Sequence, residues 1–185
     1  ICEGLVGSEM CIRDRSCTGE CNQRLVARSG IDSHTGRSSS LILMAPVLLD
    51  KLVTISPIST LLTVASDNRA LLDGLSITDD HDDVLTSKFW SLALQDNVAA
   101  KEMVKVNFQL SMILNAIHNL IPPQNNLTTM QIAAAAATKL AYIISNNKNA
   151  LTTKDILINY FSSMVTELAQ EINFNASYIE KLANN

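Results

Sequence analysis

Four aspartates around His81 form the densest group of potential cation ligands in the sequence. They are Asp79, Asp80, Asp82 and Asp83. Carboxylates at alternate positions can gather their oxygens around Ca²⁺, but an EF-hand loop needs glycine at its sixth position and glutamate at its twelfth. Counted from Asp79, those positions hold Val84 and Trp90, so an EF-hand is excluded. We expect a solvated acidic loop that caps the following turn, with an irregular calcium site at the four aspartates as the weaker alternative, and no other metal or cofactor.

Two cysteines and a histidine near the N-terminus are the next candidates for metal chemistry. Cys17 and Cys21 are separated by three residues, and His34 follows thirteen residues later. A structural zinc site needs four ligands, usually as two pairs. The other two cysteines, Cys2 and Cys11, lie in a tail that is excluded below as adaptor-like, so no second pair remains. Cys17 and Cys21 are therefore expected to be free thiols or to bridge one another.

Residue types of a hydrolase triad occur together at Asp32, Ser33 and His34. No neighbouring residue could orient a nucleophile there, and the flanking Gly30 and Gly36 are typical of a turn. The sequence also lacks a glycine-rich phosphate loop, a His-Glu-x-x-His motif and a Gly-x-Ser-x-Gly motif. These observations predict a protein that is not an enzyme.

Composition and charge narrow the class of protein further. Hydrophobic residues make up 47% of the 185 residues and charged residues 17%, which is enough apolar material for a folded core. The net charge of −4 argues against nucleic-acid binding. No apolar run reaches the roughly 18 residues that a membrane span needs, so no span is predicted.

The composition changes near residue 43 and suggests three regions. All four cysteines and five of the six glycines precede this point, whereas every lysine follows it. Residues 5–15 resemble a peptide that recurs at the ends of unrelated metagenomic reading frames and looks like translated adaptor sequence. The resemblance implies that residues 1–15 are a non-native tail. We expect residues 16–55 to form a β lead-in, which could end an upstream β-domain, and residues 56–185 to form a helical domain.

Two short apolar runs predict two strands in the lead-in. Residues 24–28 set Leu25, Val26 and Ala27 between two arginines, and the apolar run 41–45 ends at Pro46. The glycine-rich stretch 29–36 between them has turn chemistry, so the two strands should pair as a hairpin.

Helix-start signals then recur along the rest of the chain. Ser56 followed by Pro57 begins the first helix, Asp67 caps a second that Gly74 stops, and Asp96 is expected to cap the longest, over 97–120. A short helix or an anchored turn is expected at Phe89, Trp90, Leu92 and Leu94. Further helices are expected from residue 128 to 144, over 152–172 and over 176–182. The predicted fold is therefore mainly α, a compact bundle of about five to six helices behind a short β-hairpin.

The longest predicted helix carries an apolar stripe with heptad-like spacing. Its residues are Ala99, Met103, Val106, Leu110, Ile113, Ile117 and Leu120. Such a stripe suits the central helix of a bundle, and an intermolecular coiled coil is the alternative. Val104, Phe108, Met112 and Ala116 widen the apolar face, which favours burial within one domain.

Three stretches resemble a module of large bacterial surface and secreted proteins with adhesin-like or cadherin-like repeats. They are residues 29–36, the strand 41–46 that ends in Ala-Pro, and residues 53–62, where Ser-Pro-Ile-Ser-Thr-Leu stands for the family pattern Thr-Pro-Leu-Thr-Thr-Leu. The resemblance implies an extracellular structural or interaction module, a β-domain just upstream, no catalytic residues, and partners among the neighbouring domains of the same polypeptide. The alternative is an intracellular helical domain that binds a protein partner through the heptad stripe or through residues 133–137.

Overall fold

The computed structural model describes residues 24–31, 38–48, 51–120, 129–148, 150–152, 158–163 and 166. The adaptor-like tail over 1–15, the candidate ligands Cys17, Cys21 and His34, and the last predicted helix over 176–182 lie outside these residues.

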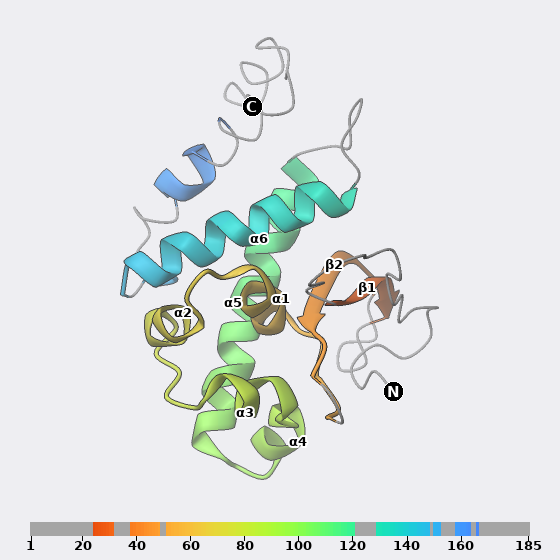
Figure 1. Ribbon diagram of the computed structural model, residues 1–185, viewed down its shortest axis with the longest axis vertical. Helices are drawn as coiled ribbons and strands as arrows, with labels where there is room; N and C mark the ends of the chain where they lie inside the picture. The colour runs from red at the N-terminus through yellow and green to blue at the C-terminus, as the bar shows by residue number, and fades with distance from the viewer. Residues whose placement is uncertain are drawn as a thin grey trace.

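The described chain begins with a two-stranded antiparallel hairpin. Strand β1 spans Arg24–Ile31 and strand β2 spans Ser38–Pro46, with Val26 opposite Met44 and an irregular register between Arg28 and Gly30. The predicted pair of strands is therefore confirmed. The hairpin lies at one side of the helices and β2 leads toward them (Figure 1).

Helices make up most of the remaining described chain. They are α1 (Pro57–Val64), α2 (Asn68–Gly74), α3 (His81–Thr86), α4 (Phe89–Leu94), α5 (Val98–Leu120) and α6 (Thr129–Asn146), and residues 158–163 are also helical. This arrangement confirms the predicted mainly helical fold with a β lead-in. Among the described helices, none combines the length and the hydropathy that crossing a bilayer requires.

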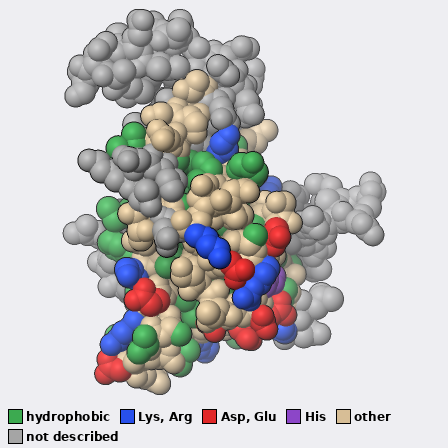
Figure 2. All heavy atoms as spheres, turned by 90° about the vertical axis from the view of Figure 1, so that its left-hand side faces the viewer, with side chains coloured by type: hydrophobic (Ala, Val, Ile, Leu, Met, Phe, Trp, Pro, Cys, Tyr) green, Lys and Arg blue, Asp and Glu red, His purple; other side chains and the backbone are tan. Residues whose placement is uncertain are grey.

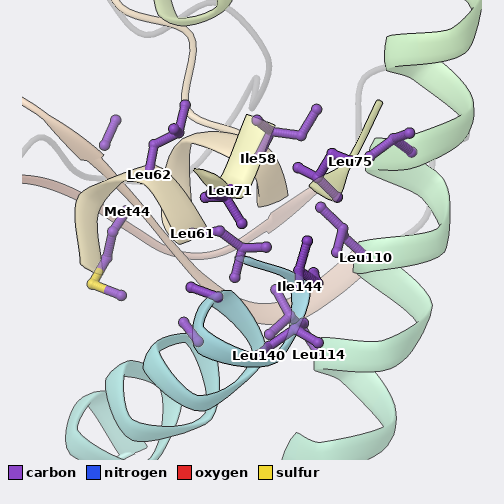
Figure 3. Close-up of a cluster of buried hydrophobic side chains, with 14 of the residues drawn as sticks. Met44, Ile58, Leu61, Leu62, Leu71, Leu75, Leu110, Leu114, Leu140 and Ile144 are labelled. Atoms are coloured by element: carbon purple, nitrogen blue, oxygen red, sulfur yellow. The ribbon is translucent and has the colours of Figure 1, made fainter. Parts of the chain in front are cut away.

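Helix α1 lies at the centre of the assembly and contacts β2, α5 and α6 (Figure 1). Its side chains Ile58 and Leu61 are fully buried. Around them gather aliphatic side chains from four further elements (Figure 3), namely Met44, Leu71, Leu110, Leu114, Leu140 and Ile144. Tyr160, from the helix predicted over 152–172, is buried as well, with its hydroxyl 3.4 Å from the Ala136 carbonyl oxygen of α6.

Helix α5 buries most of its predicted stripe but not the residues expected to widen it. Its buried residues include Met103, Val106, Leu110, Ile113 and Ile117. Phe108 and Met112, in contrast, are 59% and 62% exposed, so the prediction that they join the core is wrong. The buried side of α5 includes Asn107 instead of Phe108 and Met112. Asn107 is buried because it accepts a hydrogen bond from the Ile58 amide at the start of α1.

Two local predictions need correction. Asp96 does not cap α5, because its φ is 62° whereas the backbone of a capping residue is extended. The cap is Asn97, whose Oδ1 accepts a hydrogen bond from the Ala100 amide at 2.9 Å. The acidic stretch 79–83 is not wholly a loop, since α3 begins at His81. Its first turn contains two of the carboxylates, where they interact favourably with the positive end of the helix dipole.

Gly74 ends α2 as predicted, but it does so at a close contact between helices. A methyl group at Gly74 would overlap the carbonyl oxygen of Ile144 in α6 and lie 2.9 Å from the carbonyl carbon. The positive φ that often follows a helix is found two residues later, at Ser76. Glycine is therefore needed here because the α6 backbone approaches so closely.

We predict that Gly74→Ala destabilises the protein by about 1–3 kcal/mol, the usual cost of forcing extra atoms into a packed site. Helix propensity alone predicts the opposite sign, since alanine stabilises a helix interior by about 0.5–1 kcal/mol relative to glycine. Urea unfolding of the two proteins measures the difference. A variant as stable as the original chain would show that α2 and α6 are not in backbone contact.

Candidate functional site

The acidic residues predicted as a weak calcium site are spread among basic partners from other parts of the chain. Lys51 Nζ lies 2.7 Å from Asp82 Oδ2, and His81 Nδ1 lies 3.2 Å from Asp82 Oδ1. Arg69 of α2 lies 4.0 Å from Asp80 and 3.1 Å from Asp73. Acidic and basic side chains are intermixed across this face of the molecule (Figure 2).

This arrangement gives a cation no assembled site. No group of three or more His, Cys, Asp or Glu side chains within the described ranges could hold a metal ion. The contacts of Asp80 and Asp82 instead join the loop before α1, α2 and the start of α3. Calcium binding by Asp79, Asp80, Asp82 and Asp83 was the weaker alternative, and the arrangement of these carboxylates adds no support to it.

A second polar group, buried in the core, joins the hairpin to the helices. We call it the β2–α1 junction. It consists of the side chains of Ser56, Ser59, Thr60 and Asn107 together with the backbone of Met44. These four side chains are the buried polar ones of the described chain.

The junction begins with a capping box at the start of α1. Ser56 Oγ accepts from the Ser59 amide at 3.1 Å, and Ser59 Oγ accepts from the Ser56 amide at 2.7 Å. Pro57 occupies the first helical position, where its missing N–H leaves nothing unsatisfied. The sequence predicted this helix start correctly because all of its signals are local.

The same helix also completes the hydrogen bonding of β2. The Met44 amide donates to Thr60 Oγ1 at 2.9 Å, and the Met44 carbonyl oxygen lies 2.7 Å from Ser59 Oγ. Met44 is fully buried, so water cannot replace these partners. Two hydroxyls on successive residues of α1 therefore satisfy both backbone groups of one strand residue.

Asn107 extends the junction to α5. Its Oδ1 accepts from the Ile58 amide at 3.1 Å, and its Nδ2 donates to the Met103 carbonyl oxygen at 3.0 Å. Asn107 is only 2% exposed although its side chain is polar, and it was not among the residues expected in the core. Its position four residues after Met103 and three before Leu110, both buried, was a usable signal.

A small apolar cleft lies between β2, α1, α5 and α6. Its lining includes Ile42, Leu114, Ile117 and Ile132, with His118 and Thr60 as its polar members. The Thr60 hydroxyl already serves the junction, which leaves His118 as the one side chain of the described lining that could direct a ligand. The cleft therefore lacks the convergent polar groups of a specific binding site.

The two surfaces proposed for partner binding by an intracellular domain are largely internal. The heptad stripe of α5 faces the core, and within 133–137 the side chains of Ala136 and Ala137 are buried.

No family model, characterised protein or solved structure matches this chain. The functional argument therefore rests on the residues of the chain itself.

We predict that Asn107→Ala destabilises the fold by about 1–3 kcal/mol, because the Ile58 amide is left buried without its acceptor. Asn115→Ala, on the exposed side of the same helix, is the matched control and should be neutral or slightly stabilising. Chemical denaturation of both variants makes the comparison. Equal stabilities would mean that Asn107 is not part of the buried junction.

The ion pair of Asp82 predicts a pH dependence. The hydrogen bond from Lys51, with a smaller contribution from His81, lowers the pKa of the Asp82 carboxyl below its usual value of 3.8. Its contribution to stability is therefore present above pH 3.8 and is lost as the pH falls through the folded-state pKa. Asp82→Asn should flatten the acid side of a melting-temperature profile, and added salt should shrink the difference.

Asp83→Asn removes the same charge from the same helical turn and is the control for this measurement. If both variants lose stability on acidification in the same way, the contact between Lys51 and Asp82 does not contribute in solution.

Proposed function

We propose that this chain is a non-catalytic structural module of a larger bacterial cell-surface or secreted protein. Its role is to hold the β-hairpin, and the polypeptide that leads into it, at a fixed position on the helical body. Its partners are the neighbouring domains of the same polypeptide. The observation that carries the proposal is the β2–α1 junction.

Three of the four buried polar side chains of the described chain join one element to another. Ser59 and Thr60 bond the backbone of β2, and Asn107 bonds the backbone of α1. Hydrogen bonds in such a dry environment are costly to break, because each released group stays buried and unpaired. A two-stranded hairpin is marginal alone in water, so this attachment gives it a defined structure.

The residues that carry the family resemblance are those that build the junction. The strand that ends in Ala45 and Pro46 supplies Met44, and the Ser-Pro-Ile-Ser-Thr-Leu stretch supplies both hydroxyls. The family pattern keeps threonines at the positions of Ser59 and Thr60, and threonine has the same hydroxyl. This agreement supports an origin in a bacterial surface or secreted protein.

The intracellular alternative fits these contacts less well. A coding sequence that starts at Met44 would support this alternative, but such a chain would lack β1, the strand that pairs with β2. The gene sequence upstream tests the localisation directly. A signal peptide and β-repeats in the same frame support the surface protein, whereas a ribosome-binding site placed for Met44 contradicts it.

Native-state hydrogen exchange tests the structural role. If the hairpin is fixed to the helices, amides of β1 and β2 should exchange through the same global opening as the buried amides of α5. Thr60→Val keeps the side-chain shape but leaves the Met44 amide without its acceptor. The hairpin amides should then exchange about tenfold faster or more relative to those of α5, as expected from a lost buried hydrogen bond.

Thr63→Val is the matched control, because the Thr63 hydroxyl bonds only the Ser59 carbonyl oxygen within its own helix. It should leave the ratio of hairpin to α5 exchange unchanged. The proposal fails if the original hairpin already exchanges by independent local opening, or if both threonine variants behave alike.

A further inference from the structure

The solvent side of α5 carries a second strip of residues with heptad-like spacing. We call it the outer strip. It consists of Lys101, Lys105, Phe108, Met112, Asn115 and Asn119, and all six are exposed. At 100° per residue the strip lies opposite the buried stripe, and Leu110 and Leu114 turn toward the core (Figure 3).

The centre of the outer strip is apolar. Phe108 and Met112 are one helical turn apart, and more than half of each side chain is exposed. The lysine stems can extend this apolar area, because their ammonium groups are held by acidic neighbours. Lys101 Nζ lies 2.6 Å from Asp96, and Lys105 Nζ lies 3.2 Å from Glu102.

The order of residues in the strip is complementary to itself when reversed. Positions 108 and 112 are symmetric about residue 110, as are 105 and 115, and 101 and 119. An antiparallel pair of α5 helices related by a two-fold axis therefore sets Phe108 against Met112 of the second copy, and each lysine against an asparagine. Interfaces of this kind place the same patch of both copies in contact.

We propose that the module associates with a second copy of itself through the outer strips of two antiparallel α5 helices. Phe108 and Met112 make a thioether–aromatic contact at the centre, twice by symmetry. Lys101 and Lys105 donate to the side-chain oxygens of Asn119 and Asn115 across the interface. A single helix pair buries less than the roughly 1,200–2,000 Å² of a stable complex, so the dimer is weak and depends on concentration.

Charge selects the antiparallel arrangement over the parallel one. A parallel pair would oppose Lys101 to Lys101 and Lys105 to Lys105, which is repulsive. The antiparallel pair instead brings both lysines beside the carboxyl-terminal half of the other helix, near the negative end of its dipole. The two arrangements therefore predict opposite changes in the dissociation constant when Asn115 and Asn119 become negatively charged.

Sedimentation velocity from micromolar to millimolar concentration, with reductant present, is the first experiment. The full chain should shift from monomer to dimer across this range. Phe108→Glu combined with Met112→Glu should stay monomeric throughout. The control pair, Leu52→Glu with Tyr142→Glu, changes side chains that are 60% and 63% exposed on other elements and should dimerise normally. A monomeric original chain, or a dimer that survives the Phe108 and Met112 changes, overturns the proposal.

The second experiment replaces Asn115 and Asn119 with aspartate. In the antiparallel dimer the new carboxylates face Lys105 and Lys101 of the second copy, so the dissociation constant should fall severalfold at low salt and recover at high salt. In a parallel dimer the same carboxylates face one another, and the dissociation constant should rise. A rise, or no change, overturns the antiparallel pairing, and circular dichroism verifies that both variants keep their helices.

Discussion

The fold depends on how the backbone of Met44 is satisfied once it is buried. One edge of β2 pairs with β1, and at Met44 the other edge turns into the core, away from water. An unpaired amide and carbonyl there would each carry the full cost of desolvation. The chain meets this constraint with the hydroxyls of Ser59 and Thr60, so the position of α1 on the strand is fixed by hydrogen bonds as well as by apolar contact.

Fixing α1 in this way determines the placement of its neighbours. Its first turn directs the Ile58 amide at α5, where Asn107 accepts it, and its apolar side packs on α6. Helix α6 must then pass close to α2, and Gly74 makes that approach possible. A core with few aromatic residues gains its specificity from such polar and steric constraints, because aliphatic side chains alone tolerate several packings.

The features that depend on residues close together in the chain, such as helix starts and strands, could be predicted from the sequence. The Ser56-Pro57 start, the Asp67 cap and the two strands rest on signals within a few residues, and they were found. The spacing of Asn107 from Met103 and Leu110 indicates its burial, but its partner, the Ile58 amide, is defined only by the packing of α1 on α5. The exposure of Phe108 likewise depends on which side of α5 its neighbours cover, and the number of apolar residues along one helix does not determine that side. The ion pairs of the acidic stretch could not be predicted for a similar reason, since the partners Lys51 and Arg69 come from elements whose approach only the folded chain defines.

The two sides of α5 can serve two purposes at once. The inner side holds α1 and, through Ser59 and Thr60, the hairpin; the outer strip lies across the helix axis from these contacts. Pairing through the strip would therefore leave the hairpin and its incoming chain unobstructed. Because the strip and the hairpin lie on opposite sides of α5, the two-fold axis of such a dimer would place the two hairpins on its opposite faces.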